Sequence, residues 1–348
     1  MKNKTSIMLD DDIALSVRHL VKNFSIGGSW YSNRKEGVVS AIADISFDIR
    51  RGTTMGLVGE SGCGKSTTAR CILRLIDPTS GSVFFRTDAD SSQVSDILTE
   101  SPEALRRLRQ DMQIVFQDPF ASLNPRMTVG KSIEEILIVN SNMDRNERQS
   151  RVFELLGLVG LETIHAKRFP HEFSGGQRQR IGVARALALN PSFIVCDEPV
   201  SALDVSIQAQ VLNLLLKLQS DLGLTYLFIT HDLAVVRQIC DEVAVMYLGK
   251  IVEHSPVETL FAEPMHPYTQ ALVSAAPIPD PKRQRNRTRI LLEGDVPSPI
   301  NPPIGCRFQS RCPIGKNEKK CLEIEPPLLK INNEHRVACH FPEIRSVI

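Results

Sequence analysis

A glycine-rich stretch, GESGCGKS at Gly59–Ser66, constrains the fold of this 348-residue chain more than any other segment. It follows the apolar, β-branched run TTMGLV, which predicts a buried strand, and it leads into STTARCILRLI, which has helical periodicity. Glycines at such a turn allow successive backbone N–H groups to surround an anion, and the positive end of the helix strengthens the attraction. The stretch therefore predicts a nucleoside triphosphate site between a strand and a helix.

The other side chains of this phosphate loop fit the same prediction. Lys65 would supply a positive charge for the outer phosphates, and the Ser66 hydroxyl is placed to ligate Mg²⁺. Cys63 is expected to be a small filler, and Thr67 to support the helix. The residues predicted to form the nucleotide site here are Gly59, Glu60, Ser61, Gly62, Cys63, Gly64, Lys65, Ser66 and Thr67.

A second apolar strand, Phe193–Cys196, ends in the adjacent acids Asp197 and Glu198. Triphosphate hydrolysis needs a carboxylate that holds the metal ion and a group that polarises the attacking water. Neighbours on a strand point to opposite faces, so the backbone has to bend here if both acids serve one site. We expect Asp197 to hold Mg²⁺ through water and Glu198 to polarise the attacking water. A solvated acidic loop is the alternative.

A second glycine-rich helix start occurs in FSGGQRQRIGVARALAL, where Ser174, Gly175 and Gly176 precede a helical pattern that begins near Gln177. A serine followed by glycines is expected to leave hydroxyl and N–H donors available to a phosphate. One triphosphate does not need two such cradles from one domain. With SGGQ in this place, the sequence resembles the ATP-binding cassette (ABC) ATPases, in which two cassettes face each other head to tail.

The resemblance implies roles for the matching residues. In that family the SGGQ signature of one cassette contacts the γ-phosphate bound by the other, which assigns Ser174–Gln177 to the ATP of a partner. Gln117, in VFQDP, matches the glutamine that contacts the metal and the attacking water and marks the face toward a membrane partner. Asp204, in SALD, matches the loop at the dimer seam, and His231, in LFITHD, matches the switch histidine that reaches the γ-phosphate.

The same resemblance completes the predicted site. Phe24, in VKNFSI, lies where the family stacks an aromatic ring on adenine, although Trp30 and Tyr31 could replace it. The predicted catalytic residues are Glu198, His231 and Gln117, and the predicted Mg²⁺ ligands are Ser66, Gln117 and Asp197.

The order of strands and helices predicts an α/β fold with a parallel sheet covered on both faces. The resemblance implies that this is the P-loop NTPase fold of an ABC nucleotide-binding domain. We expect this cassette to span residues 1–254, with a helical subdomain at about 118–173, and a small irregular extension to span residues 255–348. The net charge of +1 does not favour a nucleic-acid partner. The sequence contains no apolar run long enough to cross a membrane and no signal-peptide pattern.

Four of the eight cysteines lie in the proline-rich tail that begins near Val296, at Cys306, Cys312, Cys321 and Cys339. Disulfides are not expected in a reducing cytoplasm, so the four thiolates suggest a metal centre that replaces a missing apolar core. Zinc sites usually have paired C-x₂₋₄-C knuckles, whereas the wide and uneven spacing of these cysteines suits an iron–sulfur cluster. We expect no regular structure in this tail, and stability separate from that of the phosphate loop.

Longer strings sharpen the resemblance. PHEFSGGQ, SALDVSIQAQV, HPYTQALVSAAPIPDP and LLEGDVPSPINPPIGCRF together resemble the ATPases of oligopeptide/dipeptide importers, most closely the F-type subunit that pairs with a D-type relative. In that family the C-terminal extension carries a [4Fe–4S] cluster. The resemblance implies ATP-driven peptide import at a bacterial inner membrane, by a chain bound to the cytoplasmic side together with two membrane subunits and a periplasmic peptide-binding protein.

Other readings stay open at the level of sequence. Importers of nickel chelates or opines share these motifs, so the substrate is not fixed. A soluble ABC ATPase of translation or DNA repair is a further alternative, although the second cassette or the long insertion typical of those proteins is not found in the sequence.

Overall fold

A computed structural model describes most of the chain. The described residues are 9–26, 37–87, 94–118, 123–277, 289–332 and 334–344. The chain divides into two compact units, which are described separately. Unit 1 comprises Met1–Ser16, Asp48–Thr54 and Phe84–Ile229, and unit 2 comprises Val17–Phe47, Met55–Val83 and Thr230–Ile348.

Unit 1 contains a parallel sheet. Strand β6 (Met112–Val115) pairs in parallel with β7 (Phe193–Asp197), and β7 pairs in parallel with β8 (Thr225–Thr230). Every residue of β7 and β8 is buried, so both faces of these strands are covered. The apolar runs at Phe193–Cys196 and Thr225–Thr230 therefore form the strands that the sequence predicts.

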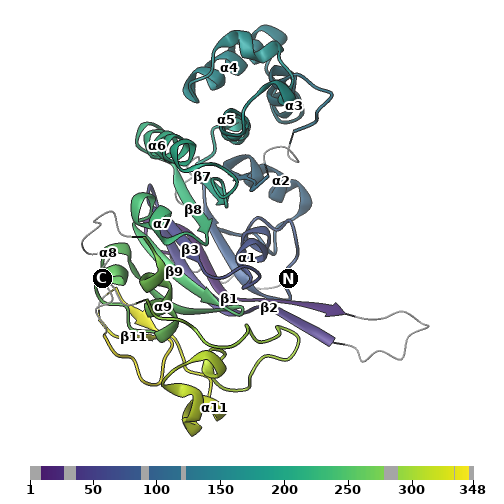
Figure 1. Cartoon of the computed structure of the whole chain (residues 1–348). Helices are drawn as coiled ribbons and strands as arrows, with labels where there is room; N and C mark the ends of the chain where they lie inside the picture. Colours follow the sequence, from purple (N-terminus) through teal and green to yellow (C-terminus); the bar gives the residue numbers. More distant parts are fainter. Residues whose placement is uncertain are drawn as a thin grey trace, which may run out of the picture. The chain divides into compact units, whose positions relative to one another are not determined.

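The helices of unit 1 follow their sequence signals. Helix α4 begins with a capping box, in which Asp144 accepts from the N–H of Glu147 and Glu147 accepts from the N–H of Asp144. Helices α3, α4 and α5 pack against one another (Figure 1). The helices and short strand of this unit are α2 (Pro102–Asp111), α3 (Val129–Asn140), α4 (Arg145–Leu158), η1 (Thr163–Lys167), η2 (Pro170–Glu172), α5 (Gly175–Ala186), η3 (Leu187–Leu189), α6 (Val205–Leu222) and β5 (Val94–Asp96).

Unit 2 contains the strand before the phosphate loop. Its strands run in the order β11-β12-β10-β9-β3, with β3 parallel to β9 and the other pairs antiparallel. These strands are β3 (Thr54–Val58), β9 (Glu242–Tyr247), β10 (Lys250–Pro256), β11 (Leu329–Lys330) and β12 (Arg336–Val337). Its helices before the tail are α1 (Lys65–Ile72), α7 (Leu233–Ile239), α8 (Val257–Ala262) and α9 (Pro267–Ala275).

A further sheet has the order β2-β1-β4-β5 and includes β1 (Ile13–Ile26), β2 (Gly37–Arg50) and β4 (Ser80–Arg86).

The tail has more regular structure than its prolines predict. Strand β12 pairs with β10, with Val337 opposite Glu253, and β11, the yellow strand labelled in Figure 1, pairs with β12. The edge of an existing sheet supplies hydrogen-bond partners to a segment too short to form a sheet by itself. The expectation of an irregular tail was therefore wrong for η4 (Gln309–Arg311), η5 (Gly315–Asn317), α11 (Lys319–Glu323), β11 and β12.

The tail also has a core, which it shares with the rest of unit 2. Phe308 is 1% exposed, and its ring lies 5.2 Å from that of Tyr247 and 5.5 Å from that of Tyr268. Aromatic rings in such tilted contacts contribute beyond the area they bury. The tail thus packs into the same apolar cluster as strands β9 and β10. Among the described residues, no helix combines the length and apolar character that crossing a bilayer requires.

Candidate functional site

The phosphate loop depends on glycine for both its shape and its packing. Gly59 has φ +154°, and a Cβ there would lie 2.1 Å from the carbonyl oxygen of Met246. Gly64 has φ +112°, and a Cβ there would lie 2.2 Å from the carbonyl oxygen of Ala41. Residues with a Cβ disfavour these angles, and the backbone contacts exclude one on steric grounds. Chain segments far from the loop in sequence therefore hold it in place.

Lys65 folds back over this loop. Its Nζ donates to the carbonyl oxygens of Gly59 (2.7 Å) and Glu60 (2.9 Å), and its side chain is buried. Helix α1 begins at Lys65 without a side-chain cap and without an acidic residue in its first turn. The positive end of α1 is thus not opposed by a carboxylate of the helix itself, which suits an anion. Cys63 is buried, as expected of a filler, and burial raises the pKa of its thiol.

The two acids after β7 lie on either side of a sharp bend. Asp197 is the last residue of β7 and is 3% exposed, and Glu198 follows with φ +48°. The bend that the sequence requires is confirmed. A left-handed φ at a non-glycine residue is strained, and it is retained here with a hydrogen bond from the Glu198 N–H to the carbonyl oxygen of Ile229. Gln117 Nε2 donates to Glu198 Oε2 at 3.1 Å, so two predicted catalytic residues meet in unit 1.

The signature stretch forms the start of α5. Ser174 Oγ accepts from the Gln177 N–H at 3.3 Å, and Gln177 Oε1 accepts from the Ser174 N–H at 3.1 Å. The Gln177 N–H is therefore not a free donor as predicted, because it is already paired within this capping box. Ser174 and Gly175 are exposed, whereas Gly176 is buried. A Cβ at Gly176 would lie 2.3 Å from Ile207 Cγ2, so this glycine allows α5 to approach α6.

The remaining motif residues lie beside helices and strands, except Phe24, which lies within β1. Asp204 caps α6 by accepting from the Ile207 N–H at 3.0 Å, and this bond, followed by one from the Ser206 hydroxyl, lowers the pKa of its carboxyl. His231 directly follows β8 and is exposed. Phe24 is 36% exposed, with Lys22 Nζ 4.8 Å from its ring centroid. Trp30 and Tyr31, the alternatives for adenine stacking, lie outside the described residues.

Two residues beyond the cassette contact the phosphate loop. Tyr268, on α9, accepts from the Glu60 N–H through its hydroxyl at 2.9 Å. Arg311, in the tail, donates through Nη1 to both carboxylate oxygens of Glu60, at 3.0 and 2.9 Å. The expectation that tail and phosphate loop are stabilised separately was therefore wrong. The shared core around Phe308 and the Glu60 contacts connect them.

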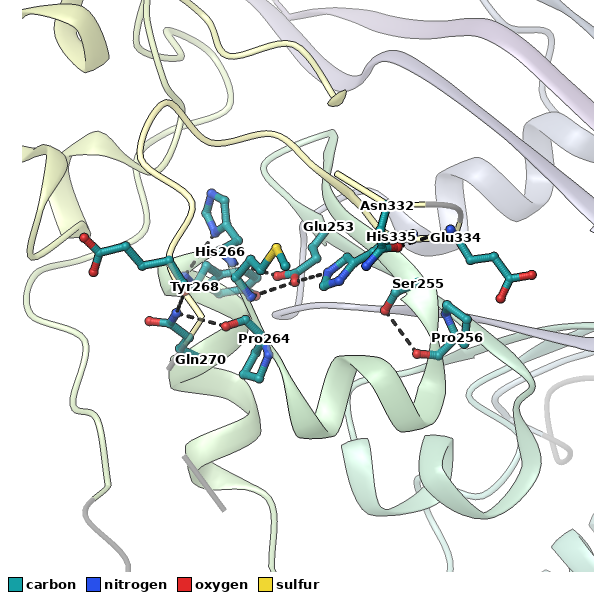
Figure 2. Close-up of polar contacts among 12 residues, drawn as sticks. Glu253, Ser255, Pro256, Pro264, His266, Tyr268, Gln270, Asn332, Glu334 and His335 are labelled. Carbon is teal, nitrogen blue, oxygen red and sulfur yellow. Dashed lines mark hydrogen bonds and ion pairs between the residues drawn. The ribbon is translucent and has the colours of Figure 1, made fainter. Parts of the chain in front are cut away.

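A buried carboxylate in the middle of β10 contacts the tail. Figure 2 shows Glu253, which is fully buried, at the centre of a polar network. It accepts from the N–H groups of Met265 (2.8 Å) and His266 (2.9 Å), and His335 Nε2 of the tail lies 2.7 Å from its Oε1. Nδ1 of His266 accepts in turn from the Tyr268 N–H at 3.1 Å. Burial lowers the pKa of His266 to about 4, and the charge of Glu253 opposes this shift.

The four tail cysteines line one small cavity, together with His266 and Phe341. The Gly315 N–H donates to Cys312 Sγ at 3.1 Å, and the Phe341 N–H donates to Cys339 Sγ at 3.4 Å. Burial raises the pKa of the Cys306 thiol to about 12 and that of Cys339 to about 11. Within the described residues, which include all four cysteines, no three His, Cys, Asp or Glu side chains are grouped closely enough to hold a metal ion.

Two protein families match successive parts of the chain. A family described as "ABC transporter" matches residues 42–201, and one described as "Oligopeptide/dipeptide transporter, C-terminal region" matches residues 252–321. The probable peptide ABC transporter ATP-binding protein y4tS of Sinorhizobium fredii is 51% identical over 94% of this chain and 90% of that protein. The oligopeptide transport ATP-binding protein AppF of Bacillus subtilis is 50% identical over 95% of this chain and 98% of that protein.

The chain belongs to the ATP-binding proteins of ABC transporters. The solved structures agree with this family. The ATP-binding cassette MJ0796, in a dimeric post-hydrolysis state bound to ADP and Pi, matches with a TM-score of 0.59 and 29% identity, over 70% of this chain and 98% of that one. The predicted P-loop NTPase fold is confirmed, and the chain is an ABC ATPase.

The motifs of this ABC ATPase could be identified from the sequence, but its supporting contacts could not. Tyr268 lies in the string HPYTQ, which contributed to the family resemblance, but the sequence indicated no role for this tyrosine. Arg311 is 251 residues from Glu60 and has no local signal at all. Glu253 and His335 likewise pair across 82 residues.

Proposed function

We propose that this chain is the ATP-hydrolysing subunit of an importer of di- or oligopeptides. The observation that carries the proposal is that one chain joins a complete set of ABC motifs to the C-terminal region of oligopeptide/dipeptide transporters. Its relatives, named as peptide or oligopeptide transport ATP-binding proteins, span nearly its whole length, which supports the same substrate class. The cassette would span residues 1–254, with its helical subdomain at about 118–173, and the extension residues 255–348.

Each unit would contribute a part of the catalytic machinery. In unit 2, the phosphate loop and Lys65 would bind the triphosphate of ATP, with Phe24 against the adenine and His231 near the γ-phosphate. In unit 1, Glu198 would polarise the attacking water, and its hydrogen bond from Gln117 would fix the orientation of the carboxylate. Ser66, Gln117 and Asp197 would hold Mg²⁺, which neutralises charge on the phosphates when it is bound.

The signature would act on the ATP of a second cassette. Ser174 and Gly175 are exposed at the start of α5, which supports contact with a partner. We propose that the seam of the dimer contains Ser174, Gly175, Gly176, Gln177 and Asp204. The similar cassette MJ0796 is dimeric, which supports a second cassette. We propose a D-type relative as the second cassette, two membrane permease subunits, and a periplasmic peptide-binding protein. The chain would then lie on the cytoplasmic side of a bacterial inner membrane.

The tail cysteines are proposed to hold a [4Fe–4S] cluster, with zinc as the alternative. Cys306, Cys312, Cys321 and Cys339 line one cavity, which supports a shared ligand, and backbone N–H groups donate to two of the sulfurs. Anaerobically purified protein should contain iron and acid-labile sulfide in equal amounts, measured by elemental and sulfide analysis. Stoichiometric zinc without sulfide would support the alternative, and protein free of both metals would contradict a metal centre.

Two substitutions test the ATPase assignment, because they should fail in different ways. Lys65→Ala removes the charge that binds phosphates and should weaken ATP binding by about 100-fold. Glu198→Gln keeps the shape of the side chain and should retain ATP binding while turnover falls by about 100-fold or more. Fluorescent-nucleotide titration and phosphate release, both with the complex reconstituted in membranes, measure the two effects. Turnover at the parental rate by Glu198→Gln would reject its catalytic role.

Peptide import is tested in the same membranes. Uptake of a labelled tripeptide should require ATP and the parental Glu198. Uptake of a nickel chelate in place of the peptide would contradict the proposed substrate while leaving the ATPase assignment intact.

A further inference from the structure

One residue of the phosphate loop, Glu60, is held at three points. Its N–H donates to the Tyr268 hydroxyl at 2.9 Å, and its carbonyl oxygen accepts from Lys65 Nζ at 2.9 Å. Its carboxylate accepts from Arg311 Nη1 at 3.0 and 2.9 Å. Two of the three partner residues, Tyr268 and Arg311, belong to the region beyond the cassette. The first half of the loop is therefore fixed by residues that lie more than 200 positions away.

The position of Arg311 follows from the packing of the tail. Arg311 ends η4, three residues after Phe308, which is buried against Tyr247 and Tyr268. The Arg311 side chain is 9% exposed, and its guanidinium carbon lies 5.9 Å from the centre of the Tyr247 ring. An arginine restrained in this way loses little further side-chain entropy when it pairs with Glu60.

The charge of Glu60 gives this pair a consequence for ATP. A carboxylate in the loop that receives a triphosphate repels it, and the repulsion is stronger where the carboxylate is partly shielded from water. Glu60 is 28% exposed, so solvent screens its charge only in part. Pairing with Arg311 neutralises the carboxylate and holds it in one orientation.

We propose that Arg311 and Tyr268 are positioning residues through which the C-terminal extension sets the ATP affinity of the phosphate loop. This inference rests on the proposed ATP binding at that loop. Coupling between two sites is reciprocal, so ATP bound at the loop must stabilise the folded tail to the same extent.

The test is a charge-rescue experiment on the full-length chain, with a fluorescent ATP analogue as the probe. Arg311→Gln leaves the Glu60 charge uncompensated and should weaken nucleotide binding by about five- to tenfold. Glu60→Gln combined with Arg311→Gln removes both charges and should restore binding to within about twofold of the parental affinity. A merely structural role of Arg311 predicts no such rescue.

Arg307→Gln is the matched control. Arg307 precedes Arg311 by four residues, and its side chain is 11% exposed, but it contacts the carbonyl oxygen of Leu248 and the carboxylate of Glu325. It should leave nucleotide affinity unchanged, because it removes no contact with Glu60. Tyr268→Phe removes only the hydroxyl that accepts from Glu60 and should weaken binding by a smaller factor than Arg311→Gln.

Hydrogen exchange of the peptide around Cys312–Cys321 supplies an independent measurement. ATP should slow exchange there in the parental protein and not in Arg311→Gln. Equal affinities of the parental protein and Arg311→Gln overturn the proposal, as does an equal loss in Arg307→Gln or a failure of the double variant to recover. A parental protein that binds no nucleotide instead overturns the proposed function.

Discussion

Two helices in this chain begin at glycine-rich stretches, and the structure holds these two starts by different means. The start of α1 has no side-chain cap, and its glycines adopt positive φ angles against the backbone of Ala41 and Met246. The start of α5 is closed by its own residues, since Ser174 and Gln177 form a capping box. One start is built by distant segments, and the other by four consecutive residues.

The difference teaches how each start can bind an anion. A start that is held from outside leaves its own N–H groups for phosphates, and its shape depends on the tertiary structure around it. A start that caps itself is stable locally but has already used part of its hydrogen-bonding capacity. The first arrangement suits a loop that wraps around a ligand, and the second suits a preformed surface presented to a partner.

The largest expected effect separates the two starts by adding one methyl group to each. Gly64→Ala places a Cβ 2.2 Å from the Ala41 carbonyl oxygen at φ +112°, and we expect a loss of more than about 3 kcal/mol of stability together with ATP binding. In Gly175→Ala the Cβ lies 3.3 Å from Leu203 Cδ2, the end of a flexible side chain, and stability should change by about 0.5 kcal/mol or less. Thermal unfolding measures the stability of both variants. Similar losses of stability would show that the two helix starts do not differ in their need for glycine.

Acid should weaken the support of the phosphate loop and spare the self-capped start. The unfolded chain protonates His266 near pH 6.5, whereas burial holds its folded-state pKa at about 4. The unfolded state therefore binds more protons in this window, and the stability of unit 2 should fall as the pH drops, by about 1.4 kcal/mol at pH 5.5. Hydrogen exchange around Tyr268 should quicken accordingly, and exchange at the start of α5 should not.

The control for this pH effect is His266→Asn, which keeps a side-chain acceptor for the Tyr268 N–H but does not titrate. It should abolish the extra pH dependence between 6.5 and 4. A parental protein and a variant with the same pH profile would show that other groups control acid stability.

The smallest expected effect examines the capping box itself. Ser174→Ala removes the acceptor for the Gln177 N–H and should cost about 1 kcal/mol of local stability. Ser101→Ala removes a comparable cap from α2, where Ser101 accepts from Ala104, and should cost a similar amount. Only Ser174→Ala should also slow ATP hydrolysis by the assembled complex. Equal ATPase rates in the two variants would leave Ser174 with a capping role alone.

Much of the fold and many of the site's positions could be predicted from local patterns. The strand that ends at Asp197 was marked by consecutive apolar residues, because buried parallel strands are apolar on both faces. A bend at the end of this strand was expected if both adjacent acids serve one site, and the structure has it at Glu198. The tail could not be predicted in this way, because β12 forms against β10 and β11 against β12, and because its prolines by themselves predict irregular structure.

The sequence alone predicted which groups this protein would bring to ATP: glycines for a phosphate loop, Lys65, the acids after β7 and a signature helix that begins at a serine and two glycines. Each of these features depends on residues within a few positions of one another, so it can be recognised from the spacing of those residues. Only the tertiary structure decided that Arg311 and Tyr268 hold Glu60, and that Glu253 is buried against His335. A contact between residues far apart in sequence depends on how the whole chain packs, and neither partner carries a local mark of the other.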